Sequence, residues 1–174
     1  MYFHTSLPSY ISKRDEHSHT SINHATLVQK TEGEAMMTYS QWFMQHGDKH
    51  KAIMARLEHL TMDEVIRYFR FENMVEKEPT FCELYADNKK CHDLGTLNCY
   101  LCACPNFRFK EKGYHTREGK TLYSTCSIKS KEGGQFISED AIHQDCSKCF
   151  VPHSESYIKN VFDRDWFEMM ENVC

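Results

Sequence analysis

The chain has 174 residues, 26% of them charged, and a formal net charge of −4. This length suits one compact domain, and the mildly acidic balance excludes a protein whose whole surface attracts polyanions. A hydrophobic share of 40% is low for a well-filled core. We therefore expect that something besides apolar burial holds the chain together.

Nine cysteines are the most unusual feature of the composition, and eight of them fall between Cys82 and Cys149. Such density indicates either disulfides in a secreted protein or metal thiolates in a reducing compartment. The first residues contain no apolar run that could serve as the core of a signal peptide. No later stretch approaches the roughly 20 apolar residues needed to cross a bilayer. We therefore expect a cytoplasmic protein with no membrane association, whose cysteines bind metal.

Residues 1–36 are predicted to form a flexible N-terminal arm. They are rich in Ser, Thr, His and charge, and they show no sustained period of 2 or 3.6. His17, His19 and His24 could chelate a transition metal weakly, but a solvated tail is the preferred interpretation. The Met36-Met37 pair offers an alternative start of translation.

Residues 37–80 are predicted to form a helical hairpin. Its first helix is expected over residues 38–60, where Trp42, Phe43, Ile53, Met54 and Leu57 are the apolar contributors. Gly47 and Asp48 are expected to break or bend this helix.

The second helix of the hairpin has a clear start and a clear end. Thr61-Met-Asp-Glu64 has the form of a capping box, in which the Thr hydroxyl and the Glu carboxylate satisfy opening amides. Apolar residues then recur at helical spacing. Proline disfavours helical geometry in the residue before it, so the helix should end at Glu78-Pro79.

The remaining chain is predicted to be a cysteine-rich segment over residues 81–153 and a C-terminal helix over residues 154–174. A long polar loop over residues 106–124 and room for a short hairpin are expected in the first part. The apolar stripe of the C-terminal helix should pack on the N-terminal helices. The predicted fold class is a small, metal-organised, α-rich domain. Its helical frame has two N-terminal helices and one C-terminal helix around an irregular segment.

The candidate metal ligands share the residue types that zinc prefers, thiolate and imidazole. They are Cys82, Cys91, His92, Cys99, Cys102, Cys104, Cys126, Cys146, Cys149 and His153. A Cys-x-x-Cys pair lets two thiolates in a tight turn meet one ion at about 2.3 Å. Cys99/Cys102 and Cys146/Cys149 have this spacing, and His153 follows the second pair at a distance that can close a tetrahedral site.

The number of donors is sufficient for one or two zinc ions, because a closed tetrahedral site uses about four ligands. Cys91 and His92 are neighbours in sequence and would strain to bind the same ion. One of them is therefore expected to play a supporting role. Cys174, at the end of the chain, is interpreted as a free thiol.

The order of these residues resembles that in the cysteine-rich small domain family of bacteria and archaea. The resemblance is carried by Asn98-Cys99-Tyr-Leu-Cys102-Ala-Cys104-Pro105 and by Asp145-Cys146-Ser-Lys-Cys149-Phe-Val-Pro152-His153. It covers roughly residues 80–160. That family is regarded as metal-binding, so the resemblance implies a metal site without naming a biological process.

The sequence leaves two kinds of metal centre open, zinc and an iron–sulfur cluster. Zinc tolerates mixed Cys and His ligation, and His153 beside the second cysteine pair favours it. An iron–sulfur cluster is the alternative, because cubane clusters usually need four thiolates and the run from Cys99 to Cys104 is tight.

The predicted function is a non-catalytic structural or interaction module with an unidentified protein partner. The alternatives are an iron–sulfur electron-transfer protein and a nucleic-acid-binding zinc module. The latter would use basic residues interleaved with aromatic ones: Arg108, Lys110, Lys112, Arg117, Lys120, Lys129 and Lys131. Acidic residues among them dilute the charge, so a solvated surface is preferred. The sequence contains no Gly-rich phosphate loop that would indicate an enzyme.

Overall fold

The computed structural model describes residues 37–174, so the predicted N-terminal arm and its histidines lie outside the described residues. The helical elements in chain order are α1 (Tyr39–Arg56), α2 (Met62–Tyr68), α3 (Phe71–Lys77), η1 (Glu83–Asp87), η2 (Val151–His153), α4 (Glu155–Val161) and α5 (Trp166–Met170). The strands are β1 (Phe107–Phe109), β2 (His115–Arg117), β3 (Lys120–Leu122), β4 (Ser124–Cys126), β5 (Gly134–Ile137) and β6 (Ala141–Asp145).

Helix α1 is straight through the position where a break was predicted. It begins at a capping box, in which the Gln41 amide donates to the Thr38 hydroxyl (3.2 Å) and the Thr38 amide donates to the Gln41 side chain (2.9 Å). Gly47 lies inside the helix and is buried. A Cβ atom there would lie 2.2 Å from the Phe167 ring, so the glycine allows α5 to approach α1 closely.

The second predicted helix is two helices, α2 and α3. Its capping box is confirmed, because the Thr61 amide donates to the Glu64 carboxylate at 2.8 Å. The helix is interrupted where the backbone pairs with a distant segment: the Phe71 amide donates to Leu97 at 2.9 Å, and the Cys99 amide donates to Phe69 at 2.8 Å. Helix α3 ends at Lys77, as the proline at position 79 predicted.

The structure is mixed α/β, which corrects the predicted α-rich class. One sheet pairs β1 with β4, and a second has the order β2-β3-β6-β5, in which only β3 and β6 are parallel. The predicted polar loop over residues 106–124 contains three of these strands and the start of β4. The strands have three to five residues and are mostly half-buried or exposed. They therefore lack the alternating pattern by which a strand is predicted.

The predicted single C-terminal helix is also divided. Asp165 ends the turn after α4 and caps α5, since its carboxylate accepts from the Phe167 amide at 2.9 Å. Packing on the N-terminal helices is confirmed. The Trp166 ring of α5 lies 4.8 Å from that of Phe43 in α1. Lys159 of α4 forms an ion pair with Asp63 of α2 at 2.7 Å.

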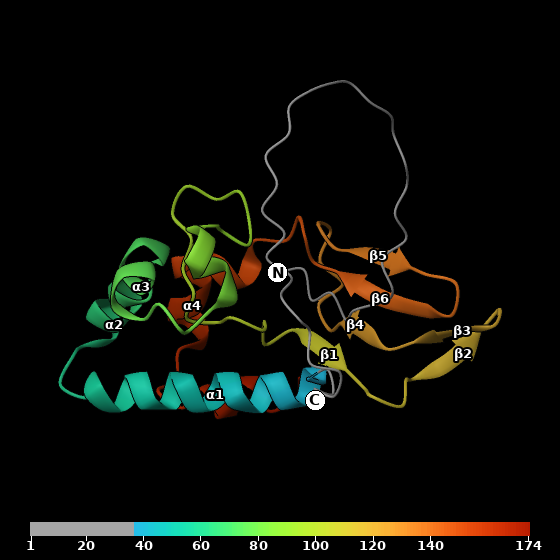
Figure 1. Cartoon of the computed structure of the whole chain (residues 1–174), viewed down its shortest axis with the longest axis horizontal. Helices are drawn as coiled ribbons and strands as arrows, with labels where there is room; N and C mark the ends of the chain where they lie inside the picture. Colours follow the sequence, from blue (N-terminus) through green and yellow to red (C-terminus); the bar gives the residue numbers. More distant parts are fainter. Residues whose placement is uncertain (1–36) are drawn as a thin grey trace, which may run out of the picture.

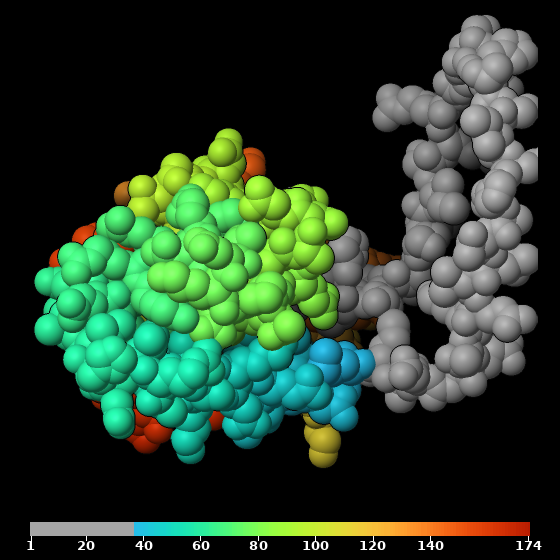
Figure 2. Space-filling model, turned by 60° about the vertical axis from the view of Figure 1, so that its left-hand side comes forward, coloured from blue at the N-terminus to red at the C-terminus, as the bar shows by residue number. Residues whose placement is uncertain are grey.

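The helices and the sheets occupy opposite ends of the molecule, and α1 runs along one side of it (Figure 1). Figure 2 shows the segment from α2 to about residue 90 lying against α1. Here Lys49 donates to the Thr80 carbonyl at 2.7 Å. The hydrophobic core lies in the helical part and includes segment 97–103, whereas between residues 104 and 148 only Ser124 and Ala141 are buried. No described helix is both long and apolar enough to cross a membrane.

Candidate metal centre

Three of the predicted ligands lie together in space. Cys91, His92 and His153 each offer a ligand atom, and these atoms all lie within 4.8 Å of one another. In the described part of the chain, this is the group of Cys, His, Asp or Glu side chains that meets this spacing. The two histidines are 6% and 5% exposed. The group is therefore a mixed sulfur and nitrogen site, the donor set that Zn²⁺ accepts.

The local structure explains why these residues meet. Cys91 and His92 follow η1 in a loop, and His153 ends η2, whose first turn contains Pro152. Asn98 connects the two segments, because its amide donates to the His153 carbonyl at 3.3 Å. The Asn98 side chain in turn donates to the Ile66 carbonyl at 2.6 Å. The loop, η2 and the end of α2 are thus tied to one buried asparagine.

His153 has its second nitrogen directed at sulfur. Its Nδ1 lies 2.8 Å from the Asn98 carbonyl oxygen, which can only accept, so Nδ1 carries the proton. Nε2 of the neutral ring then carries a free lone pair, and this atom lies 3.7 Å from the Cys91 sulfur. A ring held by a backbone carbonyl on one side, with the other nitrogen directed at a thiol, has the orientation of a metal-bound histidine.

His92 completes the group from the other side. Its ring meets the His153 ring edge-on at 4.7 Å, and its Nδ1 is buried without a hydrogen-bond partner among the described residues. Burial lowers the pKa of both histidines to about 4, and for His92 the neighbouring His153 adds to this effect. Both rings are therefore neutral at pH 7, the state in which imidazole binds metal.

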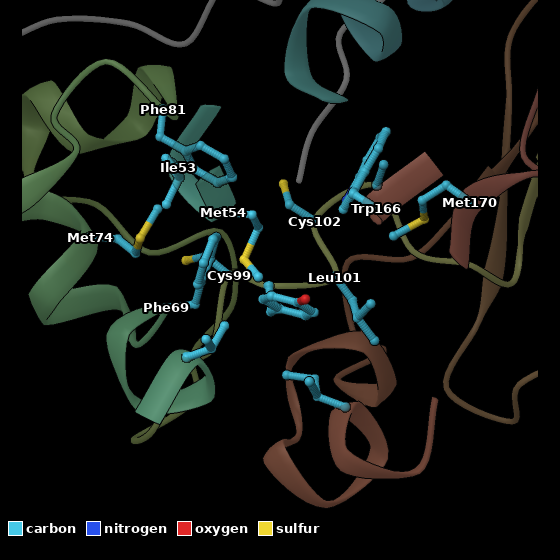
Figure 3. Close-up of a cluster of buried hydrophobic side chains, with 14 of the residues drawn as sticks. Ile53, Met54, Phe69, Met74, Phe81, Cys99, Leu101, Cys102, Trp166 and Met170 are labelled. Atoms are coloured by element: carbon cyan, nitrogen blue, oxygen red, sulfur yellow. The ribbon is translucent and has the colours of Figure 1, made fainter. Parts of the chain in front are cut away.

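A small cavity beside this group is lined by further thiols. It has a volume of about 20 Å³, and its wall includes Cys82, Cys91, Cys99, Cys102 and His153. In the surrounding core, Figure 3 labels Cys99 and Cys102 among the buried apolar side chains. A cavity needs about 10–15 Å³ of this volume to hold one water molecule, so this cavity has room for roughly one atom of that size.

Burial keeps the cavity thiols protonated in the absence of metal. It raises the pKa of Cys99 to about 12, and the Tyr85 hydroxyl beside this thiol partly opposes the rise. It also raises the pKa of Cys102, and the thiols of Cys82 and Cys91 are close enough to add to the rise. A cation would reverse this balance, since metal coordination deprotonates a thiol.

The structure groups the predicted ligands differently from what their spacing in the sequence suggested. His153 was predicted to close a site with Cys146 and Cys149, but its close partners are Cys91 and His92. One of Cys91 and His92 was expected to have a supporting role, yet both have a ligand atom within 4.8 Å of the other two in this group. All nine cysteines are free thiols, and Cys174 is exposed. Cys104 and Cys126 lie in the β-rich part with the Cys146/Cys149 pair, outside the three-residue group.

Two residues near the centre were not assigned a role from the sequence. Asn98 was noted only within the cysteine motif, although its backbone orients His153. Tyr85 was not noted, although its hydroxyl lies beside Cys99. Their side-chain types carry no metal-binding signal, so a sequence pattern could not single them out.

Comparison with known proteins gives no match to a family model, a curated protein or a solved structure. The resemblance to the cysteine-rich small domain family therefore stays a prediction. The spacing of their ligand atoms means that Cys91, His92 and His153 could hold a metal ion.

Proposed function

We propose that this chain is a zinc protein, in which Zn²⁺ bound by Cys91, His92 and His153 has a structural role. The observation that carries the proposal is the orientation of His153, whose Nδ1–H is held by a carbonyl while Nε2 faces the Cys91 sulfur at 3.7 Å. The unpartnered Nδ1 of His92 supports it, because a metal ion would satisfy this buried nitrogen.

The fourth ligand in this proposal is a cavity thiolate. Cys82, Cys99 and Cys102 line the same cavity as Cys91, and one of their sulfurs would complete a tetrahedral shell. A closed shell of four protein ligands is typical of structural zinc, whereas catalytic zinc keeps an open position.

The size of the cavity favours one ion over an iron–sulfur cluster. About 20 Å³ is room for roughly one water-sized sphere, whereas a cubane contains eight atoms and needs about four thiolates. The histidine pair also favours zinc, because imidazole suits zinc while thiolates dominate the ligation of clusters.

In this role the ion would connect segments that are distant in sequence. Without an ion, the Cys91 sulfur contacts the His153 ring, and the His153 ring is in turn held by the Asn98 carbonyl. Metal binding to such a site contributes directly to the free energy of folding, because the unfolded chain has no preformed site.

The test uses the full chain, purified without oxygen and under reducing conditions. We expect the protein to contain zinc, and a Cys91→Ser/His153→Ala variant to lose one zinc per chain, whereas Cys174→Ser loses none. Single serine variants at Cys82, Cys99 and Cys102 then identify the fourth ligand. Zinc content that is the same in the double variant and the unmodified chain would refute the site. A brown protein that contains iron would show that the centre is an iron–sulfur cluster and not a zinc site.

A further inference from the structure

Four of the cysteines outside the proposed centre lie in or next to the strands of the two small sheets: Cys104, Cys126, Cys146 and Cys149. Strand β1 pairs with β4 so that Phe107 lies opposite Cys126. The Phe107 amide donates to the Cys104 carbonyl at 2.9 Å, so Cys104 forms a turn just before β1. Cys104 and Cys126 therefore lie at the same end of this two-stranded sheet.

The other pair approaches from β6. The Gln144 amide of β6 donates to the Ser124 hydroxyl of β4 at 2.8 Å, and Cys146 follows at the end of β6. The Cys149 sulfur lies 3.3 Å from the Ser130 hydroxyl, four residues after Cys126. Thus the Cys146/Cys149 turn lies against the segment that leaves β4.

Three tight turns present these thiols. In each turn an amide donates to the carbonyl of a cysteine three residues earlier: Phe107 to Cys104, Lys129 to Cys126 at 3.4 Å, and Cys149 to Cys146 at 3.0 Å. The amides of Asn106 and Phe107 are also directed at the Cys104 thiol, where they lower its pKa against the effect of burial. Amide dipoles directed at a sulfur favour its anionic form, the form that binds metal.

The side chains of these four cysteines are buried or half-buried. Burial raises the pKa of Cys146 to about 12, and the thiols of Cys104, Cys149 and Cys126 are each close enough to raise it further. For Cys104, burial raises the pKa to about 11, and Cys149 and Cys126 act in the same direction. Within the described residues no three of these sulfurs all lie within 4.8 Å of one another, so a divalent cation would have to draw them closer to be held by all four.

The surrounding fold needs such a connection. Between residues 104 and 148 only Ser124 and Ala141 are buried, and every residue of β5 is exposed. Phe107 and Phe109 of β1 pack against the hydrophobic core, but the other strands bury little, and small sheets with little apolar burial are marginal in water. Small units of this kind usually depend on disulfides or a structural metal, and these cysteines form no disulfide.

We propose that Cys104, Cys126, Cys146 and Cys149 form a second, all-thiolate zinc site, which fastens the two small sheets together. This site shares no ligand with the centre proposed above and is argued from other observations. Binding would draw the four sulfurs to separations of about 3.8 Å, which follow from tetrahedral Zn–S bonds of about 2.3 Å.

Zinc stoichiometry and X-ray absorption on the reduced full-length chain test this site. We expect two zinc ions per chain, one of which is lost in a Cys146→Ser/Cys149→Ser variant and none in Cys174→Ser. The Cys91→Ser/His153→Ala variant should keep one zinc, with four sulfur ligands and no nitrogen ligand. This second variant leaves the β-rich part intact, so it reports on the site even if the first variant does not fold.

The outcomes separate the two proposals. If Cys91→Ser/His153→Ala holds no zinc, the all-thiolate site is refuted and the first centre stands alone. If the unmodified chain holds one zinc with sulfur ligands only, and Cys146→Ser/Cys149→Ser removes it, the all-thiolate site stands and the first centre fails. A nitrogen ligand on the zinc that remains in Cys91→Ser/His153→Ala would also refute the four-cysteine shell.

Discussion

Replacing Gly47 by alanine tests the close packing of α1 against α5. An alanine Cβ would lie 2.2 Å from Cζ and 2.5 Å from Cε1 of Phe167, whereas ordinary contacts begin at 3.4 Å. The gap between 2.2 and 3.4 Å means that the ring must move by about 1.2 Å. Phe167 contacts the Trp166 ring at 5.4 Å, so this movement disturbs the aromatic contacts between the two helices.

Two effects of opposite sign decide the result. Overpacking a well-packed site costs about 1–3 kcal/mol, whereas alanine in place of glycine within a helix gains up to about 1 kcal/mol. We expect Gly47→Ala to lower the free energy of unfolding by about 1–2 kcal/mol. In a Phe167→Ala background the steric cost disappears, so the same substitution should be neutral or stabilising.

Urea denaturation of the four chains of this double-mutant cycle measures the coupling, which we expect to be about 1–3 kcal/mol. Gly95→Ala is the control, because a Cβ there meets no atom within 4 Å, and its effect should stay within about 0.5 kcal/mol. An equal effect of Gly47→Ala in both backgrounds would show that Phe167 does not restrict this position.

Three further predictions concern buried polar groups. Burial lowers the pKa of His50 from 6.5 to about 3, so the fold favours the neutral ring and its contribution to stability is lost as pH falls below 6.5. Between pH 7.5 and 5.5, His50→Leu should lose about 1.4 kcal/mol less stability in urea denaturation than the unmodified chain. Asn98→Ala should cost about 2–4 kcal/mol by the same measurement, because its side chain donates to a carbonyl at 2.6 Å and accepts an amide at 3.0 Å. The half-buried Asn73 loses only one exposed bond of 2.7 Å when replaced by alanine. Asn73→Ala should therefore cost under about 1 kcal/mol, and equal losses for the two variants would contradict the role of Asn98. In thermal unfolding of zinc-loaded protein, Cys102→Ser should be less stable by about 1–3 kcal/mol, while Cys174→Ser stays within about 0.5 kcal/mol. Equal stability of the two variants would contradict a structural role of the Cys102 thiol.

The helix boundaries were predictable where local chemistry determines them. The Thr61 capping box and the proline at position 79 act within a few residues, and both are confirmed. A second capping box, formed by Thr38 and Gln41, was present in the sequence as a Thr-x-x-Gln signal and was missed. The division between α2 and α3 was not predictable in this way, because backbone pairing with residues 97–99 determines it.

The strands could not be predicted because their stabilisation is not local. Strand β5 is exposed along its whole length, and β3 pairs in parallel with β6, about twenty residues later in the chain. Such short polar strands carry no alternating apolar pattern, so they resemble loops in sequence. The low hydrophobic share predicted only that apolar burial is not all that holds the chain together; in the structure, the stretch between residues 104 and 148 buries little.

For the candidate centre, the residues that can bind metal were predictable, but which of them lie together in space was not. Cys91, His92 and His153 were all among the predicted ligands because cysteine and histidine are the usual donors. Spacing along the chain suggested that His153 joins Cys149, four residues before it. The hydrogen bond from the His153 ring to Asn98 instead directs it toward Cys91, 62 residues away in the sequence. Pairing across such a distance depends on the tertiary fold.

Ala103 alone separates Cys102, beside the first centre, from Cys104, in the proposed second one. Ala103 and Cys104 have φ angles of +84° and +62°, a left-handed conformation that is unfavourable for residues other than glycine. This stretch therefore has little freedom, and an ion bound on one side limits where the ligand on the other side can lie. If both proposed sites bind zinc, part of the ordering cost of the second ion would be met by the first, and their binding would be cooperative. A zinc chelator would consequently remove both ions over a narrow range of free zinc concentration.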